Sequence, residues 1–459
     1  MTIAATTATG PAPAMPPARA RLLTAPIWPT LFRLAAPAIV AMAIQSLMSI
    51  VETSYLGQLG RTELAGVALV FPLFMLAGML SAGAIGGAVS GATAQAVGAG
   101  DQPRAEAILR TAIVLSVVLG LVMGFGIWAF DTAIFGALGG TGEVLAAGQA
   151  YADVLMPGLV AIWLFNMMSG VLRGAGDMLR PALLQALVTA SHFILAPVLI
   201  IGAGGIGGNG IQGAAMAIVG AYGIGVLATL VLVLSGRATV SLRAGPVPAT
   251  VVTPLLRVGT VAGIQAVFTV VTALWITGLV GRLGPAWLAG YGIGARLEFL
   301  MIPIIFGFGA AMIAMVGANA GAGNRARAIA VAWRGALAAS VVVGLIGLGN
   351  AAFPTAWASL FTDDPAVIAA TATYMGIVAP CYAFFALGLA LYFASQGLKT
   401  LTMALAGSVA RFVIIVVGTM VLSGAGTPDA EAAFGCVAFA MVSYGLIVSL
   451  GLRFGSWRK

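Results

Sequence analysis

The stretch at residues 34–59, LAAPAIVAMAIQSLMSIVETSYLGQL, decides the fold class of this chain. It is long enough to cross a lipid bilayer, which takes about 20 predominantly apolar residues in a helix. It contains one acidic residue, Glu52, about seven residues before its carboxyl end. Because a carboxylate at membrane depth is costly to keep, we interpret Glu52 as a functional group.

The composition of the whole chain agrees with that interpretation. Of its 459 residues, 61% are hydrophobic and only 7% are charged, which excludes a soluble globular domain. The sequence predicts an all-α integral membrane protein with twelve transmembrane helices. The predicted spans are residues 34–59, 65–91, 106–130, 147–172, 181–202, 211–235, 257–281, 287–317, 328–352, 366–392, 400–422 and 432–452.

The chain contains an internal repeat. GAGDQPRAEA at 98–107 recurs as GAGNRARAIA at 321–330, and Leu59-Gly60 recurs as Leu283-Gly284. Each half has six spans, so we expect two like lobes related by a pseudo-twofold axis along the membrane normal. The predicted divisions are a disordered cytoplasmic tail (1–30), an N-lobe (31–236), a cytoplasmic linker (237–256), a C-lobe (257–453) and a second cytoplasmic tail (454–459).

The basic residues indicate orientation. With both termini in the cytoplasm, most of the 21 Lys and Arg residues fall at cytoplasmic ends of the predicted spans. They are scattered between apolar runs, which argues against a nucleic-acid surface. The first 30 residues lack the basic start and apolar core of a cleaved signal peptide. We therefore expect a multi-pass protein of the inner membrane.

The sequence argues against an enzyme. The two lysines do not stand in a phosphate-binding loop motif, and one histidine with few acids leaves no metal cluster or nucleophile triad. We expect no cofactor or metal, and an ion gradient as the energy source.

Several motifs give the chain a family resemblance. They are VETSYLG (51–57), GAGDQPRA (98–105), LRGAGDMLRP (172–181), YGIGARLE (291–298), GAGNRARA (321–328) and SQGLKT (395–400). In this order the chain resembles the multidrug and toxic compound extrusion (MATE) transporters over residues 31–453. The resemblance implies a V-shaped pair of six-helix lobes that exports organic cations in exchange for protons or sodium ions.

The resemblance also implies site residues. Glu52 matches the acid of the family's first span. The family's N-x-x-x-D-P pattern on the fifth span is matched by His192 through Pro197, where the Asp has become Ala196. The seventh span, around Gln265, and the tenth span contain no acid. The usual cation site of the C-lobe is therefore not expected here.

Physical reasoning adds a hypothesis for the N-lobe. Glu52 and His192 lie roughly 10 and 15 Å from the outer ends of their spans, as judged by helical rise. A direct or water-bridged contact would make them a proton-coupling pair that titrates as a unit. The alternative is an interior histidine that bonds a nearby carbonyl. Pro197 is expected to kink the fifth span because its ring removes a backbone donor.

Five other polar residues are candidates for lining a substrate cavity. They are Gln45, Asn166, Asp153, Gln265 and Arg411, of which Asp153 and Arg411 also have interfacial or anchoring interpretations. Glu298 is expected to be structural.

The sequence as a whole predicts a secondary multidrug antiporter that uses the proton gradient. Sodium coupling is the first alternative, a lipid or metabolite flippase of related fold is the second, and a non-transporting scaffold is the third. The expected partners are small organic cations or drugs and the lipid bilayer. We expect no nucleic acid and no obligate protein partner.

Overall fold

The computed structural model describes residues 17–203, 206–423 and 429–457, and almost all of them are helical. The first half contains α1 (Pro17–Thr24), α2 (Ile27–Leu59), α3 (Arg61–Gly78), the π-helical turn η1 (Met79–Ala84), α4 (Ile85–Ala99), α5 (Gln102–Ala129), α6 (Asp131–Ala137), α7 (Gly142–Leu155), α8 (Leu159–Gly174), α9 (Leu179–Ile200), β1 (Gly202–Ala203), β2 (Ile206–Gly207) and α10 (Gly210–Leu234). The second half contains α11 (Ala249–Gly281), α12 (Pro285–Gly321), α13 (Arg325–Ala352), α14 (Pro354–Ala358), α15 (Pro365–Val378), η2 (Ala379–Cys381), α16 (Tyr382–Leu398), α17 (Thr402–Ser423), α18 (Ala430–Gly451) and η3 (Leu452–Ser456).

Within the described residues, eleven helices are long and apolar enough to cross a membrane. A twelfth span is the pair α7 and α8, which are bent by 51° at the break between them. Pro157 lies in that break, and Pro380 lies at η2 between α15 and α16, at the corresponding place in the second half. The twelve-helix prediction is therefore confirmed.

The internal repeat is visible in local geometry. Gly100 and Gly323 end α4 and α12 with φ of 78° and 79°, a region that glycine adopts without a steric penalty. The side chain of the next residue, Asp101 or Asn324, then caps α5 or α13 by accepting a hydrogen bond from a backbone N–H three residues later. Both helices that follow contain 28 residues. The two GAG motifs thus encode the same turn twice.

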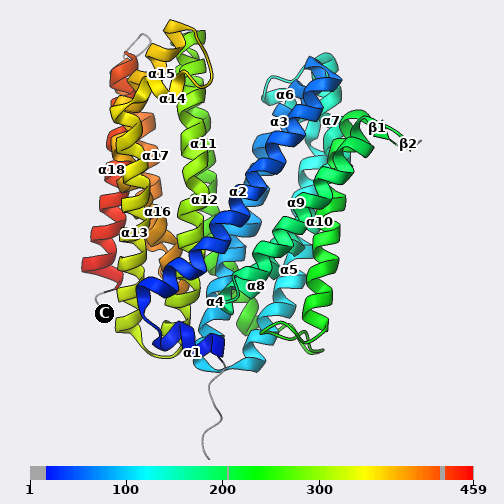
Figure 1. The fold of residues 1–459 in the computed structure, drawn as a ribbon, viewed down its shortest axis with the longest axis vertical. Coiled ribbons are helices and arrows are strands. Elements are labelled where there is room, and N and C mark those ends of the chain that lie inside the picture. Colours follow the sequence, from blue (N-terminus) through cyan, green and yellow to red (C-terminus); the bar gives the residue numbers. More distant parts are fainter. Residues whose placement is uncertain (1–16, 204–205, 424–428, 458–459) are drawn as a thin grey trace, which may run out of the picture.

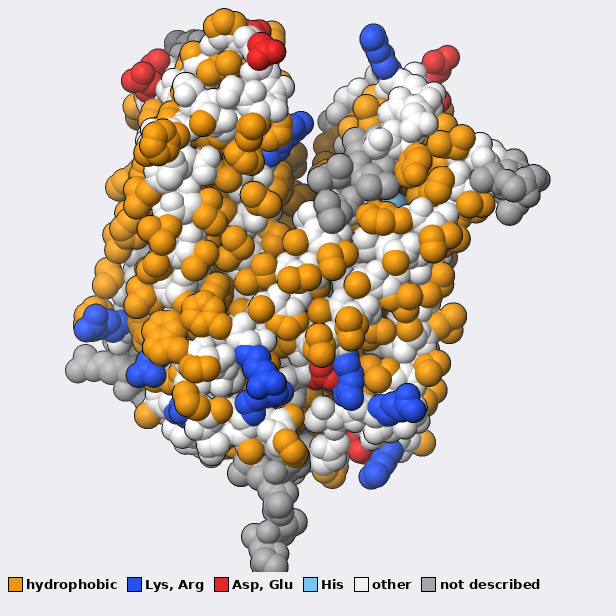
Figure 2. Space-filling view, viewed as in Figure 1, with side chains coloured by type: hydrophobic (Ala, Val, Ile, Leu, Met, Phe, Trp, Pro, Cys, Tyr) orange, Lys and Arg blue, Asp and Glu red, His pale blue; other side chains and the backbone are white. Residues whose placement is uncertain are grey.

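The helices form two bundles that lean apart (Figure 1). Helices α3 to α10 gather in one bundle, the N-lobe, and α12 to α18 in the other, the C-lobe. The space-filling view shows the lobes separated at the end away from α1 and joined at the end that contains α1 (Figure 2). We call these the distal end and the α1 end.

The first helix of each half reaches across to the other lobe. Leu31 and Leu34, near the start of α2, belong to a hydrophobic cluster of the C-lobe, whereas Leu56 belongs to the N-lobe cluster. Conversely, Val251 and Leu255, near the start of α11, pack in the N-lobe cluster. Each long helix therefore ties the two lobes together at the α1 end.

The helix ends in the structure correct both predicted boundaries of the linker between the lobes. The linker was predicted as 237–256, but α10 ends at Leu234 and α11 begins at Ala249, so only residues 235–248 connect the lobes. The linker lies against α5, where Arg110 donates to the carbonyls of Arg243 and Pro246, and Glu106 pairs with Arg243 at 3.6 Å.

The disordered tail predicted for residues 1–30 is wrong for its described part. Residues 17–24 form α1, which bonds to both lobes. Arg19 donates to the Gly98 carbonyl of α4, and Asn319 of α12 donates to the Leu22 carbonyl at 3.0 Å. Residues 1–16 lie outside the described range. Because α1 bonds to helices of both lobes, it holds the α1 end closed.

Close helix packing also joins the lobes at the α1 end. A Cβ added to Gly98 would meet the Ala318 backbone of α12, and one added to Gly91 would meet the Gln396 backbone of α16. Hydrogen bonds cross the same contact, from Gln95 to the Gly397 carbonyl at 2.7 Å and from Gln396 to the Gly83 carbonyl at 3.0 Å. Small residues allow this approach of helix backbones.

Candidate functional site

Glu52 lies inside the N-lobe on α2, and its carboxylate accepts a hydrogen bond from the Tyr151 hydroxyl of α7 at 2.8 Å. Tyr151 is buried. Among the described residues, no Lys, Arg or His forms an ion pair with Glu52. The acid is thus held by one neutral donor, which leaves it able to exchange a proton or attract a cation.

A second polar group lies below this pair, toward the α1 end. Gln45 donates to the Tyr222 hydroxyl of α10 at 3.4 Å, and the Gln185 amide of α9 is also close to that hydroxyl. Helices α2 and α9 pack together and both start at the α1 end. Glu52 follows Gln45 by seven residues on α2, and His192 follows Gln185 by seven residues on α9. Two helical turns of equal rise therefore bring Glu52 and His192 to similar depths.

The structure does not join Glu52 to His192 directly. His192 is fully buried, and neither of its ring nitrogens has a hydrogen-bond partner among the described residues. The carboxylate of Glu52 is instead bonded to Tyr151. The predicted direct contact between Glu52 and His192 is absent, and the Glu52 carboxylate accepts its hydrogen bond from Tyr151 instead. The interpretation of His192 as bonded to a carbonyl is also wrong.

Other polar atoms on the buried face of α9 also lack hydrogen-bond partners among the described residues. Gln185 Nε2 and Thr189 Oγ1 also lack partners, and with His192 they form a stripe at intervals of four and three residues. Buried polar atoms without protein partners are sites that water or ions satisfy. Pro197 lies in the last turn of α9, and the helix continues through it to Ile200.

Of the other N-lobe candidates, Asn166 lies inside and Asp153 does not. Asn166 on α8 donates to the Ser81 hydroxyl of the π-helical turn η1 at 2.8 Å. Asp153 is exposed and accepts from the Trp128 indole at 3.0 Å. It stands two residues after Tyr151, hence on the opposite side of α7 from the side facing Glu52. The prediction that Asp153 lines the cavity is therefore wrong.

The C-lobe contains an acid that sequence reasoning assigned to structure. Glu298 on α12 accepts hydrogen bonds from the hydroxyls of Tyr374 and Tyr382, the second at 3.2 Å. The guanidinium of Arg411 on α17 is close enough to interact electrostatically with this carboxylate, and lies 4.9 Å from the ring centre of Phe385. The eighth span thus supplies the C-lobe acid that the seventh and tenth spans lack.

The pairs of the two lobes correspond through the repeat. Gln265 of α11 donates to the Tyr444 hydroxyl of α18 at 3.3 Å, as Gln45 does to Tyr222. Tyr374 follows Tyr151 by 223 residues, the offset of the GAG motifs. The sequence analysis missed both tyrosines. The signal for them was the spacing Tyr151…Pro157, which recurs as Tyr374…Pro380.

Comparison with known proteins agrees with this geometry. The family model MatE matches the chain at residues 37–198 and again at 262–421, one match in each half. The chain belongs to the MATE family. Its proteins are transporters and not enzymes, and the chain is a multi-pass membrane protein of that family.

Relatives of this MATE protein include a probable multidrug resistance protein NorM of Thermotoga maritima, 26% identical over 74% of this chain and 73% of the relative. The FAD transporter of Shewanella oneidensis is 25% identical over 82% of each chain. A solved MATE protein in the straight conformation superposes with a TM-score of 0.85 at 23% identity, covering 96% of this chain and 98% of its own. A MOP superfamily transporter from Pyrococcus furiosus superposes with a TM-score of 0.85 at 22% identity, covering 97% and 100%.

A small cavity, with enclosed room for about one water molecule, lies where the lobes of this MATE protein meet. It is lined by Arg173 and Ser90 of the N-lobe and by Phe306 and Phe393 of the C-lobe. Arg173 lies 5.9 Å from the Phe306 ring centre and forms no ion pair among the described residues. Among the described residues, the buried Ser90 hydroxyl has no hydrogen-bond partner. This cavity is the floor of the space between the lobes, and its polar side chains are Ser90 and Arg173 in an otherwise apolar lining.

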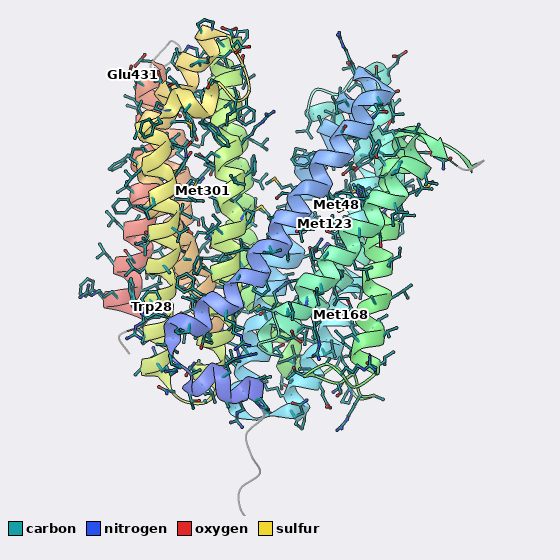
Figure 3. The ribbon with its side chains drawn as sticks, viewed as in Figure 1. Trp28, Met48, Met123, Met168, Met301 and Glu431 are labelled. Atoms are coloured by element: carbon teal, nitrogen blue, oxygen red, sulfur yellow. The ribbon has the colours of Figure 1, made fainter. Side chains whose placement is uncertain are left out.

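The methionines contribute to the lobe interiors. Met48 on α2, Met168 on α8 and Met301 on α12 lie within the bundles (Figure 3), and all three are buried. Flexible thioethers can fit varied apolar surfaces, but these three act as core residues.

Proposed function

We propose that this MATE protein exports drugs and other organic cations across the inner membrane in exchange for protons. The relatives named as multidrug resistance proteins support this substrate class. Glu52 is the group that binds the proton. The observation that carries the proposal is the Glu52 carboxylate, bonded to the neutral Tyr151 hydroxyl and free of a basic partner among the described residues.

The exchange works by changing the charge of Glu52. When Glu52 is ionised, the N-lobe attracts a cationic substrate, and when a proton from outside neutralises it, that attraction is lost and the substrate leaves. Helix α2 carries Glu52 in the N-lobe and packs its first turns on the C-lobe. It therefore couples the charge of Glu52 to the contact between the lobes.

His192 is proposed as the second group of this site. It lies at a similar depth on the adjacent α9, and its unpartnered nitrogens are suited to a bridging water between it and Glu52. Such a bridge makes the two groups titrate together.

The α1 end is proposed to face the cytoplasm. Most of the Lys and Arg side chains in view gather at this end, whereas Asp and Glu side chains appear at both ends (Figure 2). This asymmetry supports cytoplasmic termini. The separated distal end then faces outward.

The test uses inside-out membrane vesicles that contain the full chain and a fluorescent cationic dye. We expect a proton gradient to drive dye uptake at constant sodium, and a sodium gradient at fixed pH to drive none. The reverse result would overturn proton coupling and leave export intact. Sodium needs several oxygen ligands, and in the described part of the chain no three His, Cys, Asp or Glu side chains converge.

Organic anions are a second candidate substrate class. Arg173 lines the floor cavity without an acidic partner among the described residues, and a relative is named an FAD transporter. An unpaired guanidinium at this depth favours a carboxylate or phosphate group. If anions are exported, an anionic dye should compete with the cationic one, and Arg173→Gln should abolish that competition alone.

A further inference from the structure

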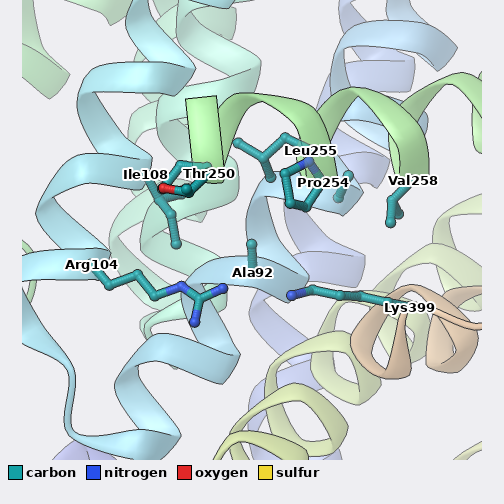
Figure 4. A pocket seen from close by; sticks show the side chains of 10 residues that line it. Ala92, Arg104, Ile108, Thr250, Pro254, Leu255, Val258 and Lys399 are labelled. Atoms are coloured by element: carbon teal, nitrogen blue, oxygen red, sulfur yellow. The ribbon is translucent and has the colours of Figure 1, made fainter. Parts of the chain in front are cut away.

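A second cavity, a shallow one with enclosed room for about one water molecule, lies at the α1 end where the start of α11 crosses onto the N-lobe. Ala88 and Ala92 of α4 and Ile108 of α5 form one side, and residues of α11 between Thr250 and Val258 form another. Two basic side chains complete the lining. Arg104 of α5 and Lys399 at the end of α16 extend toward each other beside Ala92 (Figure 4).

Of the residues that the structure describes, none that lines this cavity is acidic. The ion pairs of the described residues involve other arginines, and neither Arg104 nor Lys399 donates a side-chain hydrogen bond within the described part of the chain. Lys399 follows the membrane-spanning helix, and burial together with the nearby Arg104 lowers the pKa of its amine. Arg104 is exposed and Lys399 is half-buried. Two cations that face each other repel, and an anion between them would stabilise both.

The backbone of Lys399 points to the same conclusion. Lys399 has φ of 58°, and it is the one residue other than glycine with positive φ in the described ranges. A side chain in this conformation is strained, and such strain persists where the position has a use.

The first half of the chain has a glycine at the position that corresponds to Lys399. The residue 223 positions earlier is Gly176, with φ of 83°, which is the usual choice for a helix end of this shape. Lysine therefore replaces glycine at a position whose backbone favours glycine.

The surroundings differ in the same way between the halves. Beside Gly176, Leu22 of α1 fills the space, and a Cβ on Gly176 would lie 2.9 Å from its Cδ1 atom. Arg327, the counterpart of Arg104, donates to the Ala25 carbonyl just before α2. Beside Lys399 the start of α11 lines the space, and Arg104 extends toward Lys399 (Figure 4). One of the two related spaces is therefore filled by an apolar side chain, and the other is lined by two cations.

We propose that this cavity binds a phosphate group, with Arg104 and Lys399 as its two cationic ligands. The group comes from the headgroup of an anionic phospholipid or from a free phosphate. Its negative oxygens accept charge-assisted hydrogen bonds from the guanidinium and the ammonium. A basic pocket between membrane helices near the membrane surface is suited to a lipid phosphate, and Ile108 and Val258 offer it an apolar wall.

Phosphate binding has a consequence for the lobes. Arg104 belongs to the N-lobe and Lys399 to the C-lobe, so a shared anion links the lobes at the α1 end. It therefore stabilises the arrangement in which that end is closed. This inference does not depend on which ion drives transport.

The experiment measures thermal unfolding of the purified full chain in neutral detergent. Phosphatidylglycerol, phosphatidylcholine and inorganic phosphate are titrated separately. The variants are Lys399→Gly, which copies the residue of the other half, and Arg104→Gln. The control is Arg237→Gln, an exposed cation of the linker between the lobes.

We expect phosphatidylglycerol to raise the unfolding temperature and phosphatidylcholine not to. In both pocket variants the concentration needed for half of that rise should increase at least fivefold, and in Arg237→Gln it should be unchanged. A rise with inorganic phosphate as well identifies a free phosphate as sufficient, and a rise with the lipid alone identifies a headgroup. Equal responses in wild type and pocket variants, equal losses in Arg237→Gln, or no rise with any phosphate would overturn the proposal.

Discussion

The two lobes place a half-buried acid beside corresponding tyrosines but surround the two acids with different contacts. In the N-lobe, Glu52 accepts one hydrogen bond, from Tyr151. In the C-lobe, Glu298 accepts two, from Tyr374 and Tyr382, and has the cation of Arg411 nearby. The acids do not correspond in the repeat, because Glu52 stands on the first span of its half and Glu298 on the second.

We expect the two acids to differ in role. Two donors and a nearby cation each favour the ionised form of a carboxylate, so Glu298 has more contacts than Glu52 that oppose loss of its charge. A carboxylate with one neutral donor can lose its charge at lower cost. The repeat therefore supplies the tyrosines twice, and the surrounding helices decide which acid is able to change its charge.

The largest effect should come from the N-lobe acid. We expect Glu52→Gln to reduce proton-driven dye efflux at least tenfold, because the amide keeps the shape of the side chain and cannot carry the proton. Transport in inside-out vesicles is the measurement, with Asp153→Asn on the exposed side of α7 as a matched control. Near wild-type efflux in Glu52→Gln would remove Glu52 from the coupling mechanism.

The C-lobe acid should instead matter for stability. Arg411→Met leaves Glu298 without its nearby cation, and we expect the free energy of unfolding to fall by about 1 kcal/mol, because the two half-buried groups attract each other without a direct ion pair among the described residues. Unfolding in detergent measures it. Adding Glu298→Gln to this variant should recover part of the loss. An additive double variant would mean that the two groups do not interact.

The tyrosines allow a direct comparison of the lobes. Tyr151→Phe removes the hydrogen bond of Glu52, worth about 1 kcal/mol, and should slow efflux roughly fivefold. Tyr374→Phe leaves Tyr382 bonded to Glu298 and should change efflux less than twofold. Initial rates of dye transport test both variants. If the two variants slow transport equally, the proposed division between the lobes is wrong.

The smallest effect concerns the related helix ends at Gly176 and Lys399. Without phosphate or anionic lipid, Lys399→Gly should raise the free energy of unfolding by about 1 kcal/mol, because it removes the left-handed strain of a side chain. Gly176→Ala should lower it, since the new Cβ is strained and meets Leu22. Thermal unfolding distinguishes the two. A loss of stability in Lys399→Gly would show that Lys399 is not strained.

Sequence patterns with local causes gave reliable predictions. The GAG motifs predicted two halves of like fold, and the structure shows matching φ angles at Gly100 and Gly323 and equivalent caps at Asp101 and Asn324. Predictions of which side chains meet between two helices were less reliable. Glu52 was expected to contact His192, but its carboxylate instead accepts a hydrogen bond from Tyr151 of α7. Asp153 was a candidate for the cavity, but its side chain is exposed.

The sequence by itself determined the twelve membrane helices, the two repeated halves and the presence of a lone acid in the first span. Hydrophobic length and motif spacing are properties of the chain alone, and the bilayer requires each long apolar run to be helical. Only the tertiary structure decided which hydroxyl bonds Glu52, which hydroxyls bond Glu298, and why one of two related spaces at the α1 end is lined by two cations. These contacts depend on how helices turn and cross, which sequence spacing does not specify.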